Sequence, residues 1–133
     1  MKAPTLPKNN KHAEFFGKLF EFRNSSHLRH LKPSKPGELG SGWQHSALGS
    51  FYEEILGIAD GLIETYQGKY GLIDISVPAS KPMANPVDDI RGLAELIENS
   101  VYESFSKDTW MQNQLDGLTE LCYHTVYKLE NLK

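Results

Sequence analysis

The stretch HSALGSFYEEILGIADGLIE, residues 45–64, repeats apolar side chains every three or four residues, which predicts an amphipathic helix. At about 100° of rotation per residue, its apolar arc comprises Leu48, Tyr52, Ile55, Leu56, Ala59, Leu62 and Ile63. Asp60 and Glu64 lie one turn apart on one flank of this arc, and His45 lies at the other end of the stretch. Because a helix rises about 1.5 Å per residue, His45 is about 22 Å from Asp60. One helix therefore carries metal-type ligands that cannot meet within one chain.

Three further helices are predicted around this one. The predicted helices span residues 13–32, 42–67, 86–106 and 109–131, and the first carries a stripe of Phe16, Phe20, Arg23, His27 and His30. Gly68 is the expected left-handed residue that ends the second helix. Asn85 followed by Pro86 has the chemistry of a helix start.

The lengths of the connections predict how the helices are arranged. The first and last connections are short, which favours antiparallel neighbours, whereas the proline-rich segment 69–84 is long enough to make the second and third helices parallel. We therefore predict an all-α protein, a four-helix bundle with the up-down-down-up order of ferritin-like proteins. Residues 1–12 are expected to form a flexible tail and residues 13–133 the bundle.

Composition excludes several other classes. The chain has 133 residues, 39% hydrophobic residues and a net charge of −3, which fits one domain and gives no electrostatic reason to expect nucleic-acid binding. No apolar run is long enough for a membrane span, and the first residues do not resemble a signal peptide. The single cysteine, Cys122, excludes an intrachain disulfide. We expect a soluble, cytoplasmic or virion-associated protein with Cys122 in its core.

Dimerisation would bring the distant histidine and carboxylates together. If two copies of the second helix pair antiparallel about a two-fold axis, His45 of one subunit faces Asp60 and Glu64 of the other. His30 belongs to the same end, because the first helix finishes a short loop before the second begins. His27 lies one turn further back, where a supporting or core role is expected. Mixed imidazole and carboxylate ligands suit iron, manganese or zinc.

The segments HLRHLK (27–32) and WQHSALGSFYEEILGIADGLIETY (43–66) resemble the central motif of the Dps-like miniferritins. In that family an HxxHW segment ends the first helix, and a histidine on the second helix precedes an aspartate by fifteen positions and a glutamate by nineteen. His45, Asp60 and Glu64 have this spacing, and His30 occupies the place of the first histidine. Leu31 stands where the family has tryptophan, and the loop between the histidines is three residues longer.

The resemblance implies a function. It implies a ferroxidase centre between subunits, with His30, His45, Asp60 and Glu64 as ligands and His27 beside them, that oxidises ferrous iron. Miniferritins usually assemble into twelve-subunit shells, and many bind DNA through a lysine-rich arm, of which Lys2, Lys8 and Lys11 are a sparse version. The sequence around FYEEI and YQGKYG is also similar to that of small ferritin-like proteins encoded by tailed bacteriophages.

Each of these features also fits a simpler role. A histidine at a helix start is often structural, and an acidic pair four residues apart is often a solvated face. Glu53 is expected to form an interface salt bridge, while Glu120 and His124 are expected on the surface. Two functions therefore stay open: an iron-oxidising miniferritin, or a structural or assembly protein of a phage particle that keeps the bundle without the chemistry.

Overall fold

The computed structural model describes residues 10–32 and 41–132 of the chain. These residues are mostly helical and contain no β-strand, which confirms the all-α class. The long helices are α1 (Lys11–His30), α2 (Ser41–Tyr70), α3 (Pro86–Leu96) and α5 (Thr109–Asn131). A π-helical stretch, η1 (Ile97–Val101), and one turn, α4 (Tyr102–Ser104), continue α3. The expected tail over residues 1–9, with Lys2 and Lys8, and the loop over residues 33–40 lie outside the described residues.

The first two helices differ from their predicted boundaries by up to three residues: α1 ends at His30 rather than residue 32, and two other differences have a clear cause. Helix α1 begins at Lys11 rather than residue 13, because the Asn10 side chain accepts a hydrogen bond of 2.9 Å from the His12 backbone N–H. Helix α2 continues through Gly68 to Tyr70. The left-handed residue is Gly71, with φ of 92°, and its N–H donates to the Gln67 carbonyl at 2.9 Å.

The third helix begins as predicted but is not one regular helix to residue 106. Asn85 caps α3 by accepting a hydrogen bond from the Asp88 backbone N–H at 3.1 Å. At η1 the helix widens, because the Tyr102 N–H bonds the carbonyl of Ile97, five residues back. The last turn, α4, ends at Ser104, and the expected break before α5 follows.

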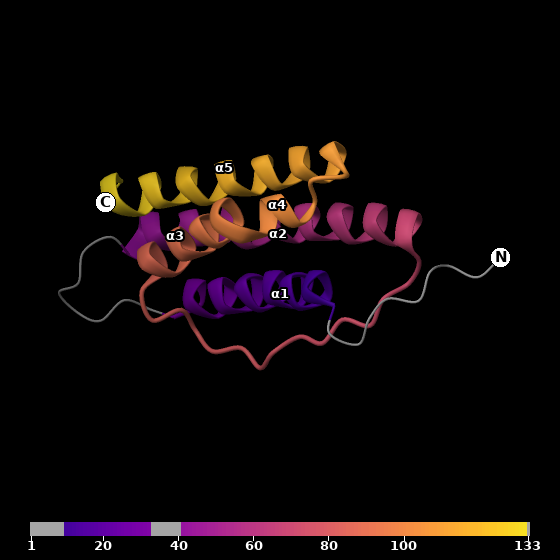
Figure 1. Cartoon of the computed structure of the whole chain (residues 1–133). Helices are drawn as coiled ribbons and strands as arrows, with labels where there is room; N and C mark the ends of the chain where they lie inside the picture. The colour runs from indigo at the N-terminus through magenta and orange to yellow at the C-terminus, as the bar shows by residue number, and fades with distance from the viewer. Residues whose placement is uncertain (1–9, 33–40, 133) are drawn as a thin grey trace.

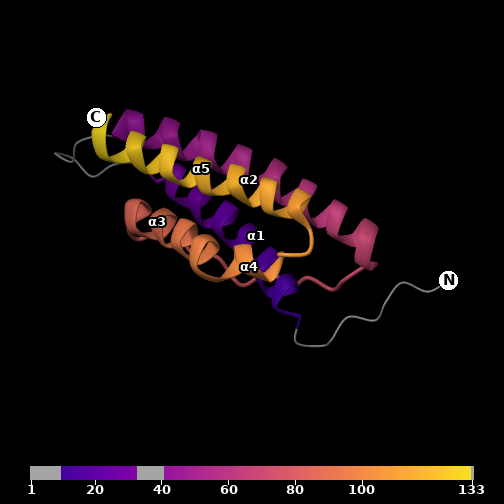
Figure 2. The same ribbon diagram turned by 45° about the horizontal axis from the view of Figure 1, so that its top comes forward.

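The four helices run side by side, as Figures 1 and 2 show. The end of α1 meets the start of α2 at His30 and His45, so these helices are antiparallel. The end of α2 meets the start of α5 at Lys69 and Asp108, so these two are also antiparallel. Helix α3 packs on α5 and runs in the same direction as α2.

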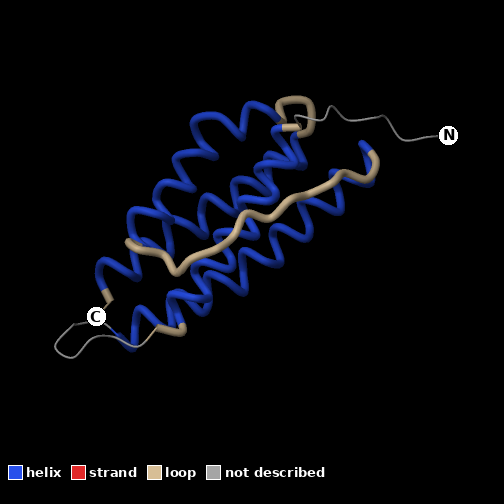
Figure 3. The backbone as a smooth tube through the Cα atoms, turned by 90° about the horizontal axis from the view of Figure 1, so that it is seen from below, coloured by secondary structure: helices blue, strands red, loops and turns tan. Residues whose placement is uncertain are grey.

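The crossover, residues 71–85, lies along the outer surface of α1 (Figure 3). The Met83 N–H donates to the Ser25 carbonyl at 3.2 Å, and the Met83 side chain is buried. The crossover passes so close to Gly17 that a Cβ there would lie 2.1 Å from the Ser76 carbonyl oxygen. Gly17 is therefore needed for this path.

One apolar core fills the space between the helices. The largest fully buried side chains are Phe16, Phe51, Phe105, Leu19, Leu48, Ile55, Leu62, Ile90, Leu93, Ile97, Met111 and Leu115. Each such side chain contributes about 1.5–3 kcal/mol when it leaves water. Cys122 lies in this core, as expected. Within the described residues, no helix has both the length and the apolar character needed to cross a membrane.

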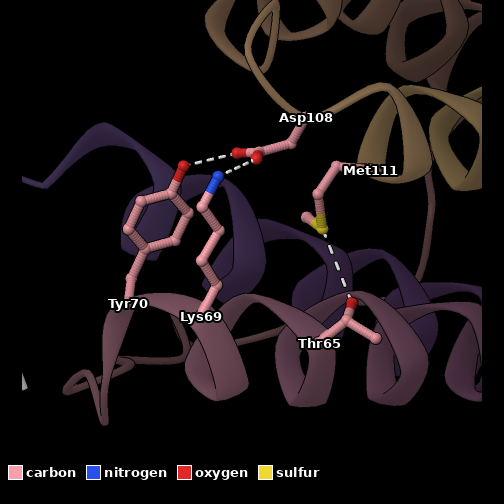
Figure 4. Close-up of polar contacts among 5 residues, drawn as sticks. All are labelled: Thr65, Lys69, Tyr70, Asp108 and Met111. Atoms are coloured by element: carbon pink, nitrogen blue, oxygen red, sulfur yellow. Dashed lines mark hydrogen bonds and ion pairs between the residues drawn. The ribbon is translucent and has the colours of Figure 1, made fainter.

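A polar contact fixes the start of α5 against the end of α2 (Figure 4). The buried carboxylate of Asp108 accepts hydrogen bonds from the Lys69 ammonium group and the Tyr70 hydroxyl. Burial opposes the charge of Asp108, but the bonds from Lys69 and Tyr70 outweigh it and hold the pKa of this carboxyl below its ordinary value. One turn further in, Thr65 Oγ1 lies 3.5 Å from Met111 Sδ.

Candidate metal centre

The structure brings His30 and His45 together at the junction of α1 and α2. Their imidazole rings stack face to face, with centroids 3.6 Å apart and planes 18° apart. His30 Nδ1 lies 2.5 Å from the backbone oxygen of His45, and His45 Nδ1 lies 2.8 Å from the backbone oxygen of His30. Two of the predicted ligands therefore form a reciprocal pair.

These bonds assign the tautomer of both rings. A backbone carbonyl can only accept, so each Nδ1 must carry the proton that is donated to it. In the neutral form, the lone pair of each ring is then on Nε2. Histidines that bind metals in proteins almost always donate their other ring N–H in this way. The pair thus has the tautomer that a metal ligand needs.

Gly49 lets the His30 ring lie against α2. A Cβ at Gly49 would be 3.0 Å from Cε1 and 3.3 Å from Nδ1 of His30. Such contacts are tighter than carbon atoms normally tolerate. A glycine one turn after His45 is therefore part of what positions the pair.

His27 extends the cluster by one turn of α1. Its ring stacks on Tyr52 of α2 with centroids 4.2 Å apart, and Tyr52 meets His30 edge-on at 5.3 Å. The Arg23 guanidinium lies 5.2 Å from the Tyr52 ring centroid. Burial, followed by the positive charges of Arg23 and His30, lowers the pKa of His27 below its ordinary value. His27 therefore lies beside the pair, and its supporting role stays a prediction.

Asp60 and Glu64 lie far along α2 from the histidines. Both are exposed, and neither has a hydrogen-bond or ion-pair partner among the described residues. Across residues 10–32 and 41–132, no three histidine, cysteine or acidic side chains are close enough to hold one ion. The separation estimated from the helix rise therefore persists in the folded chain.

The stacking of His30 on His45 limits how the two rings can bind a metal. An imidazole nitrogen binds an ion about 2.1 Å away, along a lone pair that lies in the ring plane. Because the rings are stacked with nearly parallel planes and centroids 3.6 Å apart, one ion cannot lie in both planes at bonding distance. In this arrangement each ring serves a different ion; sharing one ion requires a ring to rotate.

A second polar cluster, at the opposite end of the bundle, was missed from the sequence. His12 stacks on Phe105 with centroids 4.0 Å apart, and its ring nitrogens lie 3.2 Å from the Tyr66 hydroxyl and 3.1 Å from Ser104 Oγ. Burial lowers the pKa of His12, although the Ser104 bond and the Asp108 charge oppose the shift. The missed signal was its position four residues before Phe16, which extends the stripe of the first helix.

The other candidate residues lie outside this centre. Glu53, Glu120 and His124 are exposed and border a hollow of about 530 Å³ between α2 and α5. Glu120 and His124 are on the surface, as expected, whereas the interface role of Glu53 stays a prediction. Burial raises the pKa of the Cys122 thiol to about 12, so this cysteine is an inert core residue.

The fold and the site together define the protein as an all-α helical bundle with a histidine pair at one end. The model of DUF5856, a family of unknown function, matches residues 43–129, most of the chain, and the protein therefore belongs to this family. The matched segment contains His45, Asp60 and Glu64, whereas His27 and His30 lie before it. No curated protein and no solved structure matches the chain.

Proposed function

We propose that this protein is a ferritin-like protein of the Dps-like type that binds and oxidises ferrous iron at a site shared by two subunits. The directions of the helices support the fold assignment. Helices α1 and α2 are antiparallel, α2 and α3 run the same way, and α5 returns, with one long crossover between α2 and α3. This is the up-down-down-up order of ferritin-like bundles.

The observation that carries the proposal is the pair of Nδ1 hydrogen bonds between His30 and His45. They leave both Nε2 lone pairs available to a metal. His27, with its lowered pKa, adds a neutral imidazole next to them. Neutral imidazole is the form that binds first-row metals such as iron, manganese and zinc.

The carboxylates come from a second copy. In an antiparallel pairing of two α2 helices, Asp60 and Glu64 of one subunit approach His30 and His45 of the other. Each dimer then holds two equivalent sites. The two acidic side chains, exposed and unpaired among the described residues, are available for this contact.

The chemistry follows from the ligand set. The carboxylates offset the positive charge of iron and favour its ferric state, while the histidines supply nitrogen ligands. Each ferrous ion transfers one electron to dioxygen or peroxide, the terminal acceptor. Because His30 and His45 are stacked, the two rings would hold separate ions at each site. Iron is the substrate here, and zinc or manganese would compete for the same ligands.

The assembly implied by the resemblance is at least a two-fold dimer and, in its fullest form, a shell of twelve subunits. The site needs only the dimer. The protein would act in the cytoplasm, or in a host cytoplasm or virion if a phage encodes it. DNA binding would depend on Lys2, Lys8 and Lys11, the only lysines in the first eleven residues.

A second candidate is a structural or assembly protein of a phage particle that keeps the bundle without ferroxidase activity. The specific observation in its favour is the stacking of His30 on His45, which also joins α1 to α2 without any metal. Exposed Asp60 and Glu64 would then be a solvated face.

Iron binding and oxidation by matched variants separate the two candidates. Asp60→Ala/Glu64→Ala should lose most ferrous binding, measured anaerobically by calorimetry, and most oxidation in air. The matched control is Asp116→Ala/Glu120→Ala, an exposed acidic pair with the same spacing on α5, which should behave as wild type. His27→Ala should lose less than the Asp60/Glu64 variant. Equal iron oxidation by wild type and the Asp60/Glu64 variant would favour the structural role.

A further inference from the structure

A small hollow lies between α1 and the crossover, beside the histidine cluster. It has a volume of about 310 Å³ and is lined by Arg23, Asn24, His27, Leu28, Pro78 and Ser80. No acidic side chain is among these residues, and four of them carry groups that can donate hydrogen bonds. The lining is therefore suited to an anionic ligand.

Arg23 is the strongest donor in this hollow, and part of its guanidinium group lacks an acceptor. Its Nε is buried without a hydrogen-bond partner among the described residues. One Nη atom donates to Asn24 Oδ1 at 3.1 Å, which leaves the Asn24 amide NH₂ as a further donor. A buried donor without a partner costs about 1–3 kcal/mol. An oxygen-rich ligand whose oxygen reached this Nε would remove the cost.

The surroundings of the hollow are positively charged and incompletely bonded. Neither ion pair found in the described residues involves Arg23. Arg23 is the one formally charged side chain among the described residues that line the hollow. On the crossover side, the Ser80 hydroxyl reaches only the Pro78 carbonyl, at 3.5 Å, within residues 10–32 and 41–132.

We infer that this hollow binds a phosphate group, held by the Arg23 guanidinium together with Asn24 and Ser80. A guanidinium group presents parallel N–H donors that match the oxygens of a phosphate. The volume is at the lower end of small-ligand pockets, so it accommodates phosphate alone or the phosphate of a small monoester. This inference is independent of the iron proposal, since it needs neither a metal nor a second subunit.

The test is a calorimetric titration of the full chain in metal-free buffer, with inorganic phosphate in one arm and glycerol phosphate in the other. Wild type should bind at least one of them, and tighter binding of the ester would identify a monoester as the ligand. Arg23→Gln should weaken binding by about tenfold or more, equal to about 1.4 kcal/mol. Arg29→Gln is the matched control, because Arg29 lies on the same helix, has a similarly buried Nε and does not line the hollow.

Ser80→Asp tests the same site from the crossover, where no helix is altered. The added carboxylate should repel phosphate and abolish binding, while the circular dichroism and unfolding midpoint stay close to those of wild type. Absence of phosphate binding by folded wild type at millimolar concentration would overturn the inference. So would equal losses in Arg23→Gln and Arg29→Gln, which would indicate general charge attraction. If Arg23→Gln instead changed only self-association, Arg23 would be a contact for a carboxylate of a second copy.

Discussion

His30 and His45 donate a ring N–H to each other's backbone carbonyl while their rings stack 3.6 Å apart. This relationship joins the end of α1 to the start of α2, so it has a structural role whether or not a metal binds. It also places the lone pair of both neutral rings on Nε2. The same contact can therefore support the helix junction and prepare a metal site.

Gly49→Ala should disturb this pair without unfolding the protein. The added methyl group would lie 3.0 Å from His30 Cε1, so the ring must shift by a few tenths of an ångström from its place against His45. Since displacing groups that orient a metal ligand typically costs 10- to 100-fold in affinity, we expect ferrous binding to weaken by about tenfold. Calorimetric titration with ferrous iron under anaerobic conditions measures this effect.

Gly57→Ala is the control for this substitution. A Cβ at Gly57 meets nothing within 4 Å, so alanine there should only improve helix propensity, by about 0.5–1 kcal/mol in unfolding free energy. Its iron affinity should equal that of wild type. Identical iron affinities for Gly49→Ala and Gly57→Ala would show that the position of the His30 ring does not matter for binding.

His12 should make the bundle sensitive to mild acid. Its pKa is lowered from 6.5 in the folded state, mainly by burial, so the unfolded chain binds a proton more readily. Stability is then retained above pH 6.5 and lost as the pH falls through the lowered folded pKa. His12→Phe keeps a ring on Phe105 and should flatten this part of the profile, measured as unfolding free energy in urea.

His124→Phe, a change at an exposed position on α5, should leave the same pH profile as wild type. Part of the acid sensitivity should remain in His12→Phe, because the pKa of His27 is lowered as well. If the unfolding free energy of His12→Phe falls as steeply as that of wild type when the pH is lowered from 6.5, His12 is not the source of the acid sensitivity.

Asp108→Asn should weaken the contact between α2 and α5. Asparagine still accepts from the Tyr70 hydroxyl but loses the charge that pairs with Lys69, and we expect a loss of about 1.5 kcal/mol near pH 7. The expected loss of stability is modest because the Lys69 side chain is 45% exposed, and water weakens its attraction to Asp108. Asp116→Asn, at an exposed position on the same helix, should cost almost nothing.

The pH dependence of Asp108→Asn has a definite sign. The pKa of Asp108 is lowered from 3.8, so its contribution is present above pH 3.8 and is lost as the pH falls through the folded value. Wild type and Asp108→Asn should therefore converge in unfolding free energy in strong acid. A constant difference down to that pH would mean that the Asp108 charge is not responsible.

Local chemistry made some elements predictable. Asn85 and Pro86 define the start of α3 through groups within four residues, and the break before α5 was found as expected. The end of α2 was not predictable in the same way, because Gly68 and Gly71 are equally suitable cap residues. Helix α2 continues past Gly68 to Lys69 and Tyr70, which bond to Asp108, about forty positions away in sequence and invisible to local rules.

The candidate site was predictable only in outline. Helix lengths indicated that His30 and His45 share one end of the bundle, while Asp60 and Glu64 lie too far away to join them. The stacking of the rings and the two Nδ1 bonds depend on a close approach at Gly49, which no periodicity encodes. The meeting of histidines with carboxylates stays a prediction about two chains.

A mixing experiment tests most directly whether the site is shared. His45→Ala protein and Asp60→Ala/Glu64→Ala protein are each expected to oxidise iron poorly. When equal amounts are unfolded and refolded together, about half of the dimers are mixed and each mixed dimer regains one complete site, so about a quarter of the wild-type oxidation rate should return. Refolding either variant alone is the control. If the mixture is no more active than the separate variants, while wild type carried through the same refolding recovers its activity, the two-chain site is wrong.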